Sequence, residues 1–229
     1  MDAITTDTES EPNRESLRAL IGNLPAAPST RAECQNLWQG LAEQRLAIVA
    51  SFLHEGQAQL VFSEARSLGA PGAATPKSWQ LFESYLLGTD RKALCFDLNL
   101  CTSTLAQALK QTLASIGLNC SPGRVPLALA LLAHAAAGSS SRQLRLARVE
   151  FAGRCYLVLS ANLHSKAWDQ LSSAERAVLE LRAIGKSHSD IAQERKTSRR
   201  TVANQVAAAS HRLGVSGRLD LLRVMACAQ

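Results

Sequence analysis

The apolar residues of the chain follow first a helical spacing and then a strand-like pattern. From Thr30 onward they recur at the spacing of one helix face. Two short apolar runs follow at 46–53 and 59–62, on either side of a turn that contains Gly56, and they predict a β-hairpin. A Gly/Pro/Ala-rich stretch at 68–76 then predicts a linker that leads into a second helical region.

The same order of elements recurs in the second half of the chain. Residues 125–137 have the pattern of a helix that ends at a Gly/Ser run. Runs at 145–151 and 155–159 flank a turn with Gly153, and they predict a second hairpin. From Ala167 onward the pattern is helical again. This recurrence indicates an internal repeat.

A shift of 97 positions aligns the two halves, so that residues 60–63 fall on 157–160 and residues 116–118 fall on 213–215. The alternative is a chance alignment of two Ala/Leu-rich helical stretches, but one shift that holds through strand, helix and turn favours the repeat. The predicted fold is mainly α with two β-hairpins (α+β), a tandem duplicated helix–hairpin–helix-turn-helix unit. We also expect the hairpins to join in one small sheet, because an isolated hairpin is barely stable.

These patterns divide the chain into four segments. We expect a disordered arm over 1–28, where the sequence is polar and acidic, with a short helix at 15–21. The other segments are a first helix–hairpin–degenerate helix-turn-helix unit (29–124), a second helix and hairpin (125–165) and a C-terminal helix-turn-helix (166–229).

Charge and composition narrow the class of protein. The net charge is +6, and residues 165–229 hold 11 basic and 6 acidic groups. Such a basic segment indicates either a nucleic-acid footprint or a solvated helical surface. The chain starts without the pattern of a signal peptide, and its longest apolar run is too short to span a bilayer. We therefore expect a cytoplasmic protein without membrane contact.

The sequence carries no pattern typical of an enzyme. It has no Gly-rich phosphate loop, no nucleophile elbow and no Cys/His spacing of a zinc site. The six cysteines include no Cys-x-x-Cys pair, and we expect them to be free thiols. No catalytic residue, metal or cofactor is therefore expected.

Cap residues in the last segment predict three consecutive helices. Ser172 can cap the first of them, with Glu175 in its first turn, and Gly185 suits its end. Ser187 caps a short second helix, and a tight turn leads to Ser198, which caps the third. The buried face expected for the third helix consists of Val202, Val206, Ala209 and Leu213.

The opposite side of this third helix is polar and basic near its N-terminal end, where Arg199, Arg200, Asn204 and Gln205 lie. A helix that enters the major groove with its N-terminal residues at base edges needs this arrangement. The alternative for Arg195, Lys196 and the two arginines is a solvated turn.

These residues resemble the LuxR-type helix-turn-helix, also called the FixJ or GerE type. The resemblance runs roughly from Trp168 to Met225, and its anchors are Leu171-Ser172, Glu175, Val178-Leu179, Gly185, Ser187, Asp190-Ile191-Ala192, Ser198, Thr201-Val202, Arg212-Leu213-Gly214-Val215, Arg218 and Leu221. It implies a bacterial transcription regulator that binds double-stranded DNA through a recognition helix at 198–212. It also implies a fourth helix, here at 218–225, through which members often dimerise.

From this resemblance and the pattern we expect ten residues to contact DNA: Lys186, Ser187, Lys196, Ser198, Arg199, Arg200, Thr201, Asn204, Gln205 and Arg212. The expected assembly is a homodimer or an intramolecular pseudo-dimer, with RNA polymerase as a further partner. The family usually has a lysine at Ala203, a histidine at Gln205 and apolar residues at Arg195 and Thr197. Its base preference therefore does not transfer to this chain.

In the first half, the turn positions that correspond to Arg195 and Thr197 hold the apolar residues Leu98 and Leu100. The corresponding outer helix surface, however, has one basic residue among Thr102, Ser103, Ala106, Gln107 and Lys110. A helix that cannot neutralise phosphates reads DNA poorly. We therefore predict a degenerate helix-turn-helix that serves packing or pairing. The alternative function for the whole chain is an interaction module in which neither helix-turn-helix binds DNA.

Overall fold

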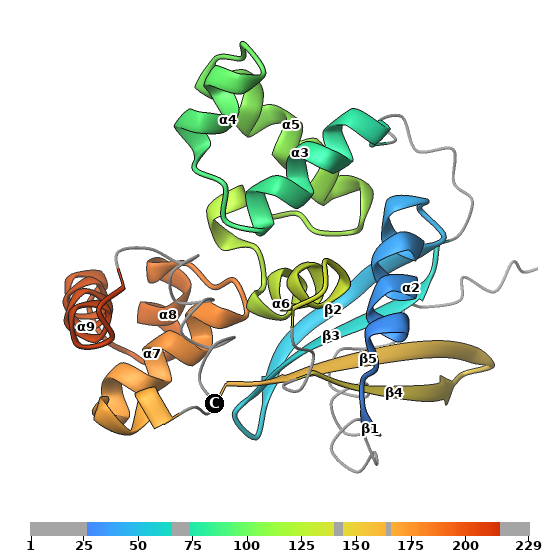
Figure 1. The fold of residues 1–229 in the computed structure, drawn as a ribbon. Helices are drawn as coiled ribbons and strands as arrows, with labels where there is room; N and C mark the ends of the chain where they lie inside the picture. The colour runs from blue at the N-terminus through green and yellow to red at the C-terminus, as the bar shows by residue number, and fades with distance from the viewer. Residues whose placement is uncertain (1–26, 66–73, 140–143, 164–165, 216–229) are drawn as a thin grey trace, which may run out of the picture.

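Two β-hairpins join in one five-stranded antiparallel sheet (Figure 1), which confirms the expected single sheet. The computed structural model describes residues 27–65, 74–139, 144–163 and 166–215. The strands are β1 (Ala27–Pro28), β2 (Leu46–His54), β3 (Gln57–Glu64), β4 (Leu144–Phe151) and β5 (Arg154–Asn162), in the order β1-β4-β5-β3-β2.

The described residues form eight α-helices, so the fold class is α+β. They are α2 (Arg31–Ala42), α3 (Pro76–Leu86), α4 (Arg91–Asp97), α5 (Thr102–Ser115), α6 (Leu127–Ala136), α7 (Ser173–Ala183), α8 (His188–Glu194) and α9 (Arg199–Arg212). Two short 3-10 helices are η1 (Pro122–Arg124) and η2 (Lys166–Gln170). Within these residues, no helix is long and apolar enough to cross a membrane.

Helices α2 and α6 pack against each other on the same face of the sheet, and α3 packs against α6 (Figure 1). The largest apolar cluster joins this face to α3, α5 and α7, and it includes the fully buried Phe62, Phe82, Leu109 and Trp168. Burying such a side chain stabilises the fold by about 1.5–3 kcal/mol. The C-terminal unit therefore shares a core with the first half through Trp168.

Strand β1 corrects the C-terminal bound of the arm that was expected over 1–28. Ala27 and Pro28 pair with Leu146 and Arg145, so these two residues belong to the sheet and not to an arm over 1–28. Proline lacks an N–H group and is tolerated on an edge strand such as this one. The helix expected at 15–21 and the fourth helix expected at 218–225 both lie outside the described residues, as does most of the linker at 68–76.

Helices α3, α4 and α5 begin and end 97 positions before α7, α8 and α9, respectively. Their turns share backbone conformation as well. Gly88 and Gly185 both have φ +95°, and Asn99 and Lys196 have φ +51° and +50°. In the sheet, Val61 on β3 lies opposite Val158 on β5, which is also 97 positions away.

Candidate nucleic-acid interface

Three serines begin the helices of the C-terminal unit, as the sequence predicts. The Ser172 hydroxyl accepts from the Glu175 amide at 3.3 Å, and the Glu175 carboxylate accepts from the Ser172 amide at 2.9 Å. Ser187 and Asp190 form the same reciprocal pair at the start of α8. Ser198 accepts from the Thr201 amide at 3.0 Å and so begins α9. Each cap satisfies amides that the first helical turn leaves unpaired.

A small apolar centre holds the three helices together. Val178 of α7, Ile191 and Ala192 of α8 and Val202 of α9 are buried against one another. Of the predicted buried face of α9, Val202 and Ala209 are fully buried, and Val206 and Leu213 are half-buried. The opposite side of α9 therefore faces solvent.

Most of the predicted contact residues lie on this solvent-facing side. Lys196, Ser198, Arg199, Arg200, Thr201, Asn204 and Arg212 are exposed, Lys186 and Gln205 are half-buried, and Ser187 is buried as the cap of α8. Within the described part of the chain, the side chains of Lys196, Arg199, Arg200 and Asn204 form no hydrogen bond or ion pair. The N-terminal end of α9 thus presents basic and amide groups that are available to a ligand.

The comparison with known families concerns this unit. Residues 169–225 match the family model described as bacterial regulatory proteins, luxR family. No curated protein and no solved structure matches the chain at a significant level. The match confirms the C-terminal LuxR-type helix-turn-helix, and this family is a regulatory DNA-binding one, not a family of enzymes.

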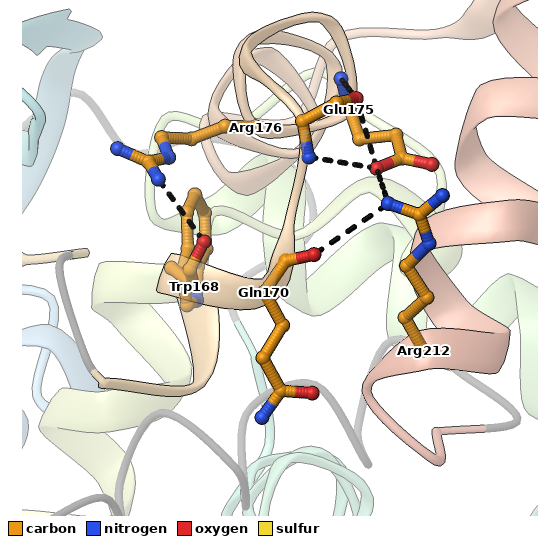
Figure 2. A network of polar contacts seen from close by, with 6 residues as sticks. Trp168, Gln170, Glu175, Arg176 and Arg212 are labelled. Atoms are coloured by element: carbon orange, nitrogen blue, oxygen red, sulfur yellow. Dashed lines mark hydrogen bonds and ion pairs between the residues drawn. The ribbon is translucent and has the colours of Figure 1, made fainter.

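Two basic residues of the LuxR-type domain are paired with acidic ones. Lys186 forms an ion pair with Glu194 across α8. The Arg212 guanidinium donates to the Glu175 carboxylate at 2.9 Å, and it lies 3.5 Å from the Gln170 carbonyl (Figure 2). These contacts connect α9 to the segment that begins α7, so Arg212 positions the helix.

Arg195 and Arg176 also make contacts that their sequence positions did not indicate. Arg195, which occupies a turn position where the family is usually apolar, donates to the Ala174 carbonyl at 2.7 Å. Arg176 donates to the Trp168 carbonyl at 3.1 Å (Figure 2). The guanidinium of Arg195 therefore joins the turn to α7 by a hydrogen bond. No local signal reveals this, because the acceptor lies 21 residues away.

The charges around α8 shift the pKa values of its first turn. Hydrogen bonds from Ser187 lower the pKa of Asp190 most, and the nearby Arg124 and Lys186 lower it further. Burial lowers the pKa of His188, and the positive charges of Arg182 and Arg199 add to that effect. The cations that affect the pKa of His188 therefore come from both α7 and α9.

The corresponding surface of the first half is much less basic. On α5 the outer residues Thr102, Ser103, Gln107 and Lys110 are exposed, and Ala106 is half-buried. The position equivalent to Ser198 is Cys101, which makes no side-chain cap hydrogen bond. Phe96 on α4 is 88% exposed. Helices α3, α4 and α5 therefore have the same lengths as the helices of the LuxR-type domain, but α5 presents little positive charge.

Proposed function

We propose that this protein is a sequence-specific DNA-binding transcription regulator, with α9 of the LuxR-type domain in the major groove. The observation that carries the proposal is the exposed N-terminal end of α9, where Arg199, Arg200 and Asn204 have no partner within the described residues. The match of residues 169–225 to a family of bacterial regulatory proteins supports it.

The side chains at this end of α9 suit two different kinds of contact. Lys196, Arg199 and Arg200 carry the charge that neutralises phosphates, and the hydroxyls of Ser198 and Thr201 lie beside them. Asn204 has an exposed amide group that can pair with adenine in the major groove, whereas the amide oxygen of the predicted contact residue Gln205 is buried. We assign base reading to Asn204 and backbone binding to the arginines.

The buried or paired members of the predicted set have supporting roles in this proposal. Ser187 caps α8, and Lys186 and Arg212 are paired with Glu194 and Glu175. The Arg212 side chain is half exposed, so a phosphate contact from it would be made in addition to its ion pair. We propose that Ser187 and Lys186 mainly hold α8 in place and that Arg212 mainly orients α9.

We propose further that the two halves descend from one duplicated unit and that the first has lost DNA binding. The shared helix bounds and turn conformations support this history. Since one chain then supplies one reading helix, two half-sites require a homodimer and not an intramolecular pseudo-dimer. RNA polymerase is the further partner that promoter binding implies.

Selection of bound DNA sequences from a random pool tests the function, with the wild-type chain beside the double variant R199A/R200A. We expect the wild type to enrich one motif and the variant to retain none of the pool at moderate salt. A wild type that retains no DNA would favour the alternative function, an interaction module. Equal enrichment by both proteins would show that α9 is not the reading helix.

A further inference from the structure

The 3-10 helix η1, which lies between α5 and α6 in the sequence, contacts the turn between α7 and α8 directly. A Cβ atom at Gly185 would lie 2.5 Å from the Arg124 carbonyl oxygen, so only glycine allows this approach. The Arg124 guanidinium is 4.0 Å from the Asp190 carboxylate at the start of α8. Arg124, which lies outside residues 169–225, is therefore held at the edge of the LuxR-type domain.

A second arginine, Arg182, is joined to the residue that η1 contacts, because its carbonyl accepts from the Gly185 amide at 3.0 Å. Arg182 lies in the last turn of α7 and is half-buried, and within the described residues its guanidinium forms no ion pair. Burial lowers the pKa of Arg182, and the neighbouring charge of Arg124 lowers it further. A partly desolvated cation beside another cation is unfavourable until an anion approaches both.

Arg182 and Arg124 lie next to α8, the helix that packs against α9. Arg182 is in the last turn of α7, Arg124 is 4.0 Å from Asp190 in the first turn of α8, and Arg199 begins α9. Burial lowers the pKa of His188 on α8, and the charges of Arg182 and Arg199 lower it further. Asp190 is the acid beside Arg124, and its carboxylate already accepts from the Ser187 amide at 2.8 Å.

We propose that Arg182 and Arg124 bind the phosphate backbone of the DNA beyond the groove that α9 reads, so that a segment outside the LuxR-type domain contributes a contact to the DNA. This inference depends on the proposed function. A polyanion that runs along the surface fits a row of separated cations better than one small anion does, because its charges are repeated at regular spacing. These contacts are independent of base sequence.

The test is DNA affinity at several salt concentrations for R124A and R182A, measured with the motif that the wild type selects. Each variant is expected to bind roughly three- to tenfold more weakly and to lower the salt slope by about one. Base preference stays unchanged. The matched control is R145A, which removes an exposed arginine from β4 on the sheet, and it is expected to bind as the wild type does.

Thermal unfolding of each variant separates lost contacts from lost fold, and R124K, which keeps the charge, should recover most of the affinity and the salt slope. The inference would be overturned if R124A and R182A had the DNA affinity and salt slope of the wild type. If R199A/R200A then lost DNA binding, the proposed function would remain intact. Tighter DNA binding by R124A would also overturn the inference, because Arg124 on η1 would then hinder DNA binding by the LuxR-type domain. A wild type without DNA affinity would contradict the proposed function itself.

Discussion

Arg212 and Glu175 connect the two ends of the LuxR-type helix-turn-helix, because the Arg212 Nη1 donates to the Glu175 carboxylate at 2.9 Å. The Glu175 side chain is 7% exposed, and the same carboxylate accepts from the Ser172 amide. One acid therefore caps α7 and holds the last turn of α9. A charge-assisted hydrogen bond of this kind is stronger than a neutral one.

The variant R212A is expected to unfold at a lower temperature than the wild type, because it leaves a nearly buried carboxylate without its charged partner. R212K should be intermediate, since a lysine keeps the charge but not the planar fork. Thermal unfolding followed by circular dichroism measures both. An R212A protein with unchanged stability but a smaller DNA salt slope would instead make Arg212 a phosphate contact.

The fold could be predicted from the sequence where the signal is local. Ser172, Ser187 and Ser198 each cap the helix that follows, and a partner three residues away suffices for that. The joining of the two distant hairpins in one sheet was expected, but individual contacts between distant segments carry no local signal. Pro28 pairs with Arg145 across 117 positions, and Arg212 meets Glu175 across 37. Among the site residues, sequence periodicity separates the faces of α9, but it does not reveal which basic residues are already paired.

Stability should fall at acid pH partly through Glu175. Hydrogen bonds from Ser172, and then the charge of Arg212, hold the pKa of this carboxyl below its ordinary value of 4.5. The stability that ionised Glu175 contributes is therefore fully present at pH values above the pKa that this carboxyl has in the unfolded chain. It is lost as the pH falls through the lower pKa of the folded protein. We expect the unfolding temperature to drop between about pH 5 and pH 3, and to drop less in E175Q, whose amide can still complete the cap. Parallel curves for the two proteins would exclude this role.

Asn204 and Arg200 should affect DNA binding in different ways. N204A is expected to lose about 1–3 kcal/mol of discrimination at one base position, because an amide reads adenine with two hydrogen bonds. R200A should weaken binding to all sequences alike and lower the salt slope by about one. Competition binding with single-base variants of the selected motif measures the difference. If N204A weakens all sequences equally, Asn204 contacts the backbone.

Gly185 is a position where the fold demands glycine for two reasons. Its φ of +95° is left-handed, and an added Cβ would lie 2.5 Å from the Arg124 carbonyl oxygen. Gly153 has φ +71° but no atom within 4 Å of such a Cβ, so G153A is the matched control. We expect G153A to cost about 1–2 kcal/mol from backbone strain alone, and G185A to cost more. If urea unfolding shows that G185A and G153A lose the same free energy of unfolding, η1 moves away from the added methyl group without a cost in stability.

Cys101 should be the most reactive of the thiols in the described residues. It is exposed at the start of α5, and hydrogen bonds with the hydroxyls of Ser103 and Thr104, at 3.0 and 2.9 Å, lower its pKa to about 7. Cys34 is buried, and burial raises the pKa of its thiol. Because the thiolate is the nucleophile, iodoacetamide at neutral pH should label Cys101 first and Cys34 last.

Peptide mass spectrometry over a time course gives the labelling rate of each cysteine, and Cys155 on β5 is an exposed thiol for comparison. The variant S103A/T104A removes both hydroxyls and should slow the labelling of Cys101 while leaving that of Cys155 unchanged. A Cys101 rate that is unaffected by this variant would mean that exposure alone, and not the hydroxyl contacts, determines its reactivity. The position equivalent to Cys101 in the second half is Ser198, which caps α9 through its hydroxyl. A reactive thiol at the start of α5 is therefore a property of the first unit that its counterpart does not share.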